Sequence, residues 1–378
     1  MKDIAARKIG VLGGGQLGRM MIQSAIDYNL NISVLDPDPN APCKDLVQNF
    51  QVGKLTDYDT VYAFGAGCDL ITIEIENVNT EALKALQSEG KSVFPQPEVI
   101  ALIQDKRKQK VFYKANRIPT ADFVLTENAA DVRQHVDFLP AVNKLGKEGY
   151  DGRGVQIIRT ATDLDQAFDK PGLLERLVPF EKELSVVVAK NEQGEIRTFP
   201  VVECSYHPSK NLVEFLFSPA DISVEIEEKA RKLAEDVIEK LGMIGLLAVE
   251  MFLTKEGEVL VNEVAPRTHN SGHQTIEGNV TSQFEQHIRA IMGLPLGNTA
   301  LTRPSAMVNL LGEEGYTGHA LYKGLEEVLG MDDVHVHLYG KKETKPFRKM
   351  GHVTLGDQSV EALKQKAQQV KGILKVIA

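Results

Sequence analysis

Short apolar runs alternate with segments of helical apolar spacing over the first hundred residues of the chain. Residues 8–12, 31–35 and 69–76 are predicted strands, whereas residues 17–28 and 80–89 repeat apolar side chains at the spacing of a helix. Strands that alternate with helices predict βαβ units in an open parallel sheet. Such sheets bind ligands beyond the carboxyl ends of their strands, so the residues that follow each strand are the first candidates for function.

A glycine-rich turn follows the first predicted strand. Gly13, Gly15 and Gly18 match the pattern G-x-G-x-x-G, and Asp36 comes 18 positions after the last of these glycines. This spacing is typical of dinucleotide-binding βαβ units. Glycines at a strand-to-helix turn also allow other phosphates or polar ligands to approach a helix N-terminus, so the motif leaves a nicotinamide or flavin cofactor as one of several interpretations.

Two sets of charged residues follow later in the N-terminal part of the chain, a pair of glutamates and a basic run. Glu74 and Glu76 end the third predicted strand, and because they are two residues apart we expect them to share one face. They either contact a ligand or are solvated charges at a strand end. Residues 105–110, DKRKQK, lie on a helical segment, and such a run is usually a solvated face.

A predicted hairpin carries one carboxylate in each of its strands. The apolar runs 246–253 and 259–261 flank a turn at Glu256-Gly257, and a two-residue turn there places Glu250 directly opposite Glu263. Like charges that face each other destabilise a sheet, whereas a cation between them would stabilise it. Two carboxylates with substrate phosphates are a typical ligand set for Mg²⁺, so the hairpin predicts a Mg²⁺-nucleotide site. The alternative is a hairpin whose glutamates face water.

A second glycine-rich segment, residues 147–154, connects two predicted strands. Its sequence KEGYDGRG is suited to a flap whose backbone N–H groups close over phosphates, and Lys144 at its base offers a positive charge. A plain hairpin loop is the alternative.

The last part of the chain, after residue 297, is smaller and more β-like. His335 and His337 share one face of a predicted strand, either as metal ligands or as solvated histidines. A basic loop follows and offers an anion pocket; it contains Lys341, Lys342, Lys345, Arg348 and Lys349.

Composition limits the class of protein. The 378 residues suffice for two or three domains, and 43% hydrophobic and 25% charged residues are ordinary for a soluble protein. A net charge of −9 argues against a general nucleic-acid surface. The three cysteines have no metal-binding spacing and are odd in number, which favours a reducing compartment. No apolar run is long enough to span a membrane. We therefore expect a cytoplasmic protein that binds neither nucleic acid nor membrane.

The motifs taken together resemble a known enzyme family. The order GGGQLGRM, IEIENV, GYDGRG, NEVAPRTHNSGH and YGK with RKMGHVT is similar to ATP-grasp enzymes of purine biosynthesis, in particular to the 5-(carboxyamino)imidazole ribonucleotide synthase family. The resemblance implies an α/β fold of the ATP-grasp type in three parts. These are a Rossmann-like parallel sheet (1–103), an ATP-grasp domain (104–298, with a flap subdomain at about 115–180) and a small β-rich domain (299–378).

The resemblance also implies an activity. It implies carboxylation of aminoimidazole ribonucleotide by bicarbonate through carboxyphosphate, with ATP and Mg²⁺ as cofactors, ADP and phosphate as products, and a homodimer as the assembly. The alternatives are a sister ATP-grasp ligase such as formate-dependent glycinamide ribonucleotide transformylase, a nicotinamide dehydrogenase built on the glycine motif, and a non-catalytic nucleotide-binding regulator. A regulator would be expected to lack Glu250 or Glu263, and both are present.

The site residues follow from the same resemblance. It implies ATP contacts at Lys106, Lys144, Gly149, Tyr150, Asp151, Gly152, Arg153, Gly154, Val155, Glu175, Arg176, Leu177, Val178, Glu183, His207, Asn262 and Glu263. It implies Mg²⁺ ligands at Glu250 and Glu263, catalytic roles for Arg267, His269, Asn270, Tyr150 and Arg153, and ribonucleotide contacts at Gln16, Glu76, Tyr150, Asp151, Arg153, Lys341 and Arg348. The chain departs from the family pattern at Lys106, where an arginine is usual, and the segment around His207 aligns only with a gap.

Overall fold

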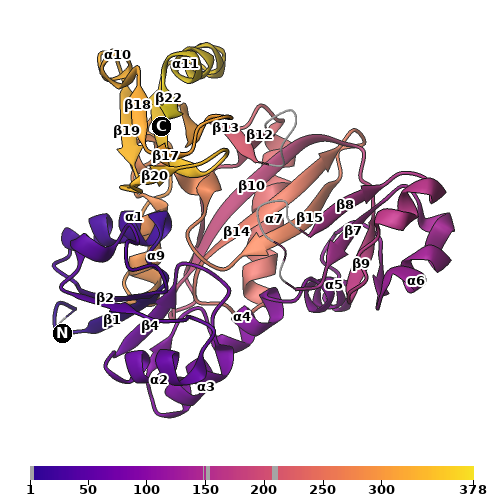
Figure 1. The fold of residues 1–378 in the computed structure, drawn as a ribbon, viewed down its shortest axis with the longest axis horizontal. Coiled ribbons are helices and arrows are strands. Elements are labelled where there is room, and N and C mark those ends of the chain that lie inside the picture. Colours follow the sequence, from indigo (N-terminus) through magenta and orange to yellow (C-terminus); the bar gives the residue numbers. More distant parts are fainter. Residues whose placement is uncertain (1–3, 148, 150–153, 207–211) are drawn as a thin grey trace.

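The computed structural model describes residues 4–147, 149, 154–206 and 212–378. The N-terminal region, coloured indigo in Figure 1, lies beside a central region in magenta to orange, and the C-terminal strands and helices in yellow form the upper part of that view. No helix within these described ranges has both the length and the apolar character that crossing a membrane requires.

The N-terminal region is a five-stranded sheet in the order β3-β2-β1-β4-β5, and every pairing in it is parallel. Its strands are β1 (Lys8–Leu12), β2 (Asn31–Asp36), β3 (Asn49–Val52), β4 (Leu70–Ile73) and β5 (Ser92–Val93), and its helices are α1 (Gln16–Ile26), α2 (Tyr58–Ala66), α3 (Thr80–Ser88) and α4 (Pro97–Ile103), with the 3-10 turn η1 (Lys44–Leu46). All four residues of β4 are buried, as expected for a central strand of a covered parallel sheet. The predicted parallel sheet is therefore confirmed.

A four-stranded antiparallel sheet, in the order β6-β9-β7-β8, follows. Its strands are β6 (Phe123–Thr126), β7 (Ala141–Leu145), β8 (Val155–Ile158) and β9 (Gly172–Arg176), and α5 (Lys106–Ala115), α6 (Ala129–Val132), η2 (Arg133–Phe138) and η3 (Ala161–Gln166) accompany them. A Cβ atom at Gly172 would lie 2.3 Å from the carbonyl oxygen of Lys144, so the close approach of β9 to β7 requires a glycine there.

The largest sheet has nine strands and links the central and C-terminal regions. Its order is β15-β14-β10-β12-β13-β16-β21-β19, and β11 pairs with β10. The strands are β10 (Phe180–Lys190), β11 (Ile196–Thr198), β12 (Val202–Tyr206), β13 (Val213–Ser218), β14 (Gly245–Thr254), β15 (Val259–Ala265), β16 (Ser305–Leu311), β19 (Val334–Leu338) and β21 (Lys349–Gly356). Because β16 pairs with β13, the sheet continues across residue 299, where we place a domain boundary from the sequence.

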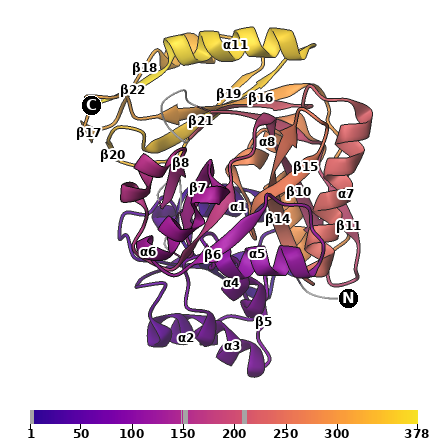
Figure 2. The ribbon, with the colours of Figure 1, turned by 90° about the vertical axis from the view of Figure 1, so that its right-hand side faces the viewer.

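Helices and short strands complete this part of the molecule. They are α7 (Val224–Lys240), η4 (Asn270–Gly272), α8 (Thr275–Gly278), α9 (Gln283–Ile291), α10 (Leu325–Leu329), α11 (Val360–Ile373), β17 (Gly318–His319), β18 (Leu321–Lys323), β20 (Glu343–Thr344) and β22 (Lys375–Ile377). Helix α11 lies along the β16 and β21 side of the large sheet in Figure 2.

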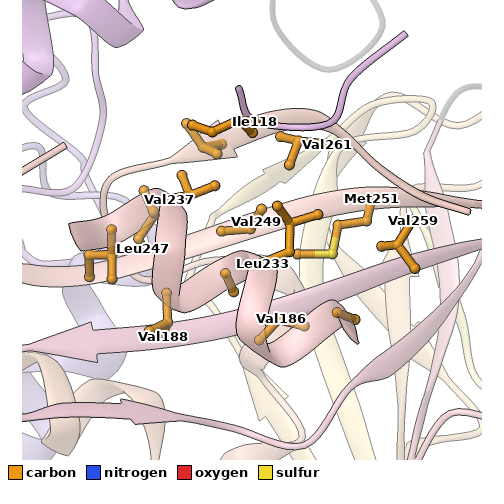
Figure 3. Close-up of a cluster of buried hydrophobic side chains, with 14 of the residues drawn as sticks. Ile118, Val186, Val188, Leu233, Val237, Leu247, Val249, Met251, Val259 and Val261 are labelled. Atoms are coloured by element: carbon orange, nitrogen blue, oxygen red, sulfur yellow. The ribbon is translucent and has the colours of Figure 1, made fainter. Parts of the chain in front are cut away.

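The core beneath the predicted hairpin explains how its carboxylates are oriented. Helix α7 buries Leu233 and Val237 against one face of β10 and β14, where Val249 and Met251 point toward it (Figure 3). Successive side chains of a strand point to opposite faces, so Glu250, which lies between these two residues, points away from α7. Full burial of each such apolar side chain contributes about 1.5–3 kcal/mol, which makes the sheet a stable platform for the polar groups on its other face.

Candidate active site

The hairpin of β14 and β15 places Glu250 opposite Glu263, as predicted. The turn differs from the prediction, because Glu258 O accepts from Thr254 N at 2.9 Å and the loop therefore has three residues, with Gly257 at a φ of 79°. A three-residue loop alone would put Glu250 out of register with Glu263. A β-bulge corrects the register. Met251 pairs with Val261 and Glu250 pairs with Glu263, so one residue of β15 between these two pairs has no partner on β14.

The extra residue of the bulge is Asn262, and it turns toward the same cavity as Glu263. Asn262 Oδ1 accepts a hydrogen bond of 3.0 Å from Lys144 Nζ. Lys106 also lines this cavity, and its Nζ lies 3.5 Å from Glu263 Oε2 and 3.3 Å from the carbonyl oxygen of Gly149. The bulge thus gathers two lysines, an amide and a carboxylate around one cavity.

The paired carboxylates fit a hard divalent cation. Burial, followed by the negative charges of Glu263 and Glu183, raises the pKa of Glu250 to about 8. Two carboxylates held this close are unfavourable without a positive charge between them, and carboxylate oxygens with phosphate oxygens are the ligands that Mg²⁺ prefers. Among the described residues no third carboxylate, histidine or cysteine completes a metal cluster, so substrate phosphates would have to supply the remaining ligands.

Glu175 is buried between Lys110 and Lys144, two lysines that line this cavity. It forms ion pairs with Lys110 and with Lys144, whose Nζ lies 2.5 Å from Glu175 Oε2. Burial alone would raise the pKa of the Glu175 carboxyl, but Lys144 and Lys110 together hold it below its usual value. Lys110 lies in the basic run that we expect to be solvated; that expectation is wrong here, since Lys110 is only 3% exposed.

The other predicted nucleotide contacts are distributed around this centre. Arg176 packs its guanidinium over the Phe138 ring at 4.3 Å, and the Leu177 backbone N–H donates to the carbonyl of Pro140 at 3.0 Å. Val178 follows β9 and is partly buried. Burial raises the pKa of Glu183 to about 7, although a hydrogen bond from Tyr206 acts in the opposite direction.

The glycine-rich segment lies only partly within the described residues. Leu145 N donates to Gly154 O at 2.9 Å, Gly154 has a φ of 73°, and Val155 pairs with Lys144 in the first position of β8. The predicted contacts Tyr150, Asp151, Gly152 and Arg153, together with His207, lie outside the described residues.

His269 follows the hairpin and is held by several polar groups. Gln283 accepts from His269 N at 2.9 Å and donates to His269 O at 2.7 Å, so one amide fixes its backbone on both sides. The backbone N–H of Ser271 donates to His269 Nδ1 at 3.3 Å, which leaves Nε2 to carry the proton of the neutral ring, 3.7 Å from Glu250 Oε1. Burial, with Arg267 nearby, lowers the pKa of His269 well below its usual value and keeps the ring neutral.

The side chain of Asn270 contacts β16, whereas the side chain of the preceding His269 lies near Glu250. Its side-chain amide forms two hydrogen bonds of 3.0 Å with the side-chain amide of Asn309, and Asn309 also donates to the carbonyl of Val213 at 2.8 Å. Both polar atoms of Asn270 are therefore engaged with β16. Sequence reasoning missed Gln283 and Asn309, because neither stands next to the motif that it holds.

Three of the predicted ribonucleotide contacts, Gln16, Glu76 and Lys341, have partners that connect the segments after β1 and β4 with later parts of the chain. Lys341 Nζ donates to Gln16 Oε1 at 2.8 Å, although 325 positions separate the two residues. Arg267 Nε lies 2.8 Å from Glu76 Oε1, which joins the segment after β15 to the segment after β4. Arg348 lies in the basic loop and donates to the carbonyl of Glu343 at 2.7 Å.

The expectation that Glu74 and Glu76 share a face assumed that both lie in the strand, and that assumption is wrong. Strand β4 ends at Ile73, so the alternation of a strand does not extend to these residues. Glu74 turns into the first glycine-rich turn, where its Oε1 accepts from Leu17 N at 3.1 Å, and Asp36 Oδ2 accepts from Gly14 N at 2.6 Å. Both carboxylates occupy N–H groups that a dinucleotide pyrophosphate would need, so the glycine motif does not support a nicotinamide or flavin cofactor.

His335 and His337 also have protein partners. His337 Nε2 lies 2.9 Å from Glu277 Oε1, and His335 Nε2 lies 3.2 Å from Asp333 Oδ1. Each imidazole is paired with a different carboxylate, so this strand does not present the two rings to a common metal ion.

Comparison with known families accounts for most of the chain. Residues 6–104 match the ribonucleotide synthetase preATP-grasp domain, residues 111–284 the ATP-grasp domain, and residues 305–366 the phosphoribosylaminoimidazole carboxylase C-terminal domain. The N5-carboxyaminoimidazole ribonucleotide synthase of Bacillus subtilis is 39% identical over 357 residues, which cover 93% of this chain and 91% of that protein. The chloroplastic phosphoribosylaminoimidazole carboxylase of Vigna aconitifolia is 38% identical over 364 residues, and this chain spans only 65% of its length.

Solved structures give the same result. The N5-carboxyaminoimidazole ribonucleotide synthetase of Thermotoga maritima superposes with a TM-score of 0.91 at 45% identity and covers 98% of this chain and 99% of its own. The corresponding enzyme of Aspergillus clavatus, in complex with ADP and 5-aminoimidazole ribonucleotide, has a TM-score of 0.89 at 32% identity and covers 97% of this chain and 98% of its own. The chain belongs to the N5-carboxyaminoimidazole ribonucleotide synthase family of ATP-grasp proteins.

Proposed function

We propose that the chain carboxylates 5-aminoimidazole ribonucleotide with ATP and bicarbonate and releases N5-carboxyaminoimidazole ribonucleotide, ADP and phosphate. One feature carries the proposal. Glu263 on β15 faces Glu250 on β14, and just after the end of β15 comes Arg267, which reaches Glu76 at the edge of the N-terminal sheet. In this proposal the segment would connect the end of the site that binds phosphate with the end that binds the ribonucleotide. The relatives crystallised with ATP, and with ADP and 5-aminoimidazole ribonucleotide, support the same pair of substrates.

The first step in this proposal transfers the γ-phosphoryl group of ATP to an oxygen of bicarbonate, giving carboxyphosphate and ADP. Such a transfer depends mainly on alignment and charge neutralisation, which Lys106 and Lys144 supply from the cavity wall. Mg²⁺ held by Glu250 and Glu263 would neutralise further charge on the phosphate oxygens. These roles would make the hairpin and the two lysines the nucleotide end of the site.

In the second step the exocyclic amine bonds to the carboxyl carbon of carboxyphosphate, phosphate leaves and the amine proton is released. Arg267 and the neutral His269, which carries its proton on Nε2, are the donors next to the paired carboxylates. A mixed anhydride reacts readily with water, so a buried setting on this side of the sheet protects it. Gln16 and Lys341 would bind the ribonucleotide, and Lys341 with Arg348 would bind its 5′-phosphate.

A coupled assay of ADP release tests the proposal. We expect ADP only when ATP, Mg²⁺, bicarbonate and 5-aminoimidazole ribonucleotide are all present, and product analysis should find the carboxylated ribonucleotide. Replacing bicarbonate by formate separates this activity from that of a formate-dependent ligase. ATP turnover that is indifferent to the ribonucleotide would refute the substrate assignment.

We further propose that the protein acts as a homodimer in the cytoplasm. The dimer is an inference from the family resemblance, and light scattering coupled to size-exclusion chromatography tests it through the measured mass. A reducing compartment agrees with Cys43, Cys68 and Cys204, which are free and buried. Fractionation of the source cells would test the location.

A further inference from the structure

Lys110 is held in place by groups from two other segments of the chain. Its Nζ forms an ion pair with Glu175 Oε1 on β9 and donates to Thr120 Oγ1. The Thr120 hydroxyl in turn donates to the carbonyl of Val261 on β15 at 2.6 Å. The Lys110 side chain is only 4% exposed, so it is fixed between α5, β9 and β15 and is not free to follow a ligand.

Lys144 contacts the other oxygen of the same carboxylate, but its second partner belongs to the nucleotide site. Its Nζ lies 2.5 Å from Glu175 Oε2 and 3.0 Å from Asn262 Oδ1, the amide of the bulge residue beside Glu263. Its side chain is 11% exposed and lines the cavity. In the absence of nucleotide the charge of Lys144 is therefore directed at Glu175.

Charge balance determines what happens when a phosphate competes for Lys144. Glu175 is 3% exposed at its side chain, and a buried carboxylate that loses its only partner is strongly destabilised. Glu175 has a second partner on its other oxygen, so the departure of Lys144 would leave a complete Lys110–Glu175 pair behind. Together Lys110, Lys144 and Glu175 carry two positive charges and one negative charge. The excess positive charge is available to an anionic ligand.

We propose that Lys110 is a positioning residue that remains as the counter-ion of Glu175 and thereby allows Lys144 to turn to the phosphates of bound nucleotide. The inference rests on the proposed function, since it assumes that the cavity binds ATP. It assigns Lys110 no contact with the nucleotide; its effect passes through Glu175 and Lys144.

A double-mutant cycle on nucleotide affinity tests this role. The dissociation constant of a non-hydrolysable ATP analogue with Mg²⁺ is measured by calorimetry for the wild type, Lys110→Met, Glu175→Gln and the double variant. We expect Lys110→Met to weaken binding by about tenfold or more in the wild type, because Lys144 is then retained by Glu175. In the Glu175→Gln background the same change should cost less than about threefold, because no buried carboxylate then needs a counter-ion.

The matched control is Lys114→Met, which removes an exposed lysine one turn later on α5 and should leave the affinity unchanged. A loss of about tenfold on adding Lys110→Met to Glu175→Gln would overturn the proposal, since Lys110 would then bind phosphate directly. This comparison needs only the Glu175→Gln and double variants, so it holds even if Lys110→Met alone fails to fold.

The Michaelis constants separate positioning from a general structural effect. The proposal requires Lys110→Met to raise the KM for ATP with little change in the KM for the ribonucleotide, whereas a loosened fold would raise both, and that result would count against it. A wild-type protein that does not bind the analogue would refute the proposed function itself. Binding by the wild type with an additive cycle would refute only the role of Lys110.

Discussion

Replacing Glu263 by glutamine should change stability in opposite directions with and without Mg²⁺-nucleotide. Glu263 is the second of three causes, after burial and before Glu183, that raise the pKa of Glu250 from 4.5 to about 8. This rise in pKa means that the folded protein disfavours the charged form of Glu250 by about 5 kcal/mol in total. We assign about 1–2 kcal/mol of this to Glu263, which has the sign expected for like charges that face each other across two strands.

The sign of the effect depends on pH. Because the folded-state pKa of Glu250 lies above its unfolded value, the folded protein loses stability as the pH rises from about 4.5 to about 8. At pH 8 without metal, Glu263→Gln should therefore stabilise the protein by about 1–2 kcal/mol. With Mg²⁺ and ATP the same substitution removes a ligand charge, and the apparent Mg²⁺ affinity should fall by about tenfold or more.

Thermal unfolding with and without Mg²⁺-nucleotide measures both effects. Glu256→Gln is the matched control, because it removes the same charge from an exposed position in the turn of the same hairpin. The reasoning is refuted if Glu263→Gln destabilises the metal-free protein, or if its Mg²⁺ dependence equals that of the wild type.

Three further outcomes are expected. Burial lowers the pKa of His273 to about 3 and that of His287 to about 4, so between pH 6 and 5 only the unfolded chain takes up these two protons, and each should lower the free energy of unfolding by about 1.36 kcal/mol per pH unit as the pH falls. Other buried groups such as Glu250 add their own pH dependence, so the share of His287 is measured as the difference between urea unfolding of the wild type and of His287→Gln, and equal pH slopes for the two proteins would contradict this. Asn309→Leu leaves the buried amide of Asn270 unpaired and should lower kcat about tenfold in steady-state assays, with ATP affinity unchanged by calorimetry. Arg267→Met removes the ion pair to the N-terminal sheet and should raise the ribonucleotide KM and lower kcat, whereas an effect on the ATP KM alone would argue against the placement of Arg267.

The sequence predicted the pairing of Glu250 with Glu263 better than the contacts that hold the neighbouring residues in place. The face on which Glu250 lies was not predicted from the sequence, because residues 246–253 are apolar on both sides of it; it follows from the packing of Val249 and Met251 against α7. The pairing with Glu263 was correct although the predicted turn was not, since a three-residue loop and a one-residue bulge compensate each other. A bulge leaves no signal in hydrophobic periodicity, so Asn262 was found only through the family resemblance.

The burial of Lys110 could have been predicted from the spacing of residues along its helix. The basic run predicts a solvated helix face, yet Lys106, Gln109, Lys110 and Tyr113 follow one another at the i, i+3, i+4 and i+7 spacing of a single helical face. In the structure Gln109, Lys110 and Tyr113 are buried, and all four residues line the cavity. The polar character of three of them concealed an ordinary buried face, whose tyrosine was the one visible sign.

The glycine motif shows why a local pattern cannot decide what a turn binds. Gly13, Gly15 and Gly18 provide the backbone that would suit a pyrophosphate, and Asp36 stands at the expected distance. The N–H group of Leu17 is nevertheless used by Glu74, which follows β4 and lies 57 positions further along the chain. A carboxylate at a helix N-terminus meets the same electrostatic preference as a phosphate, so the protein itself fills the anion position. Only the fold reveals this competition.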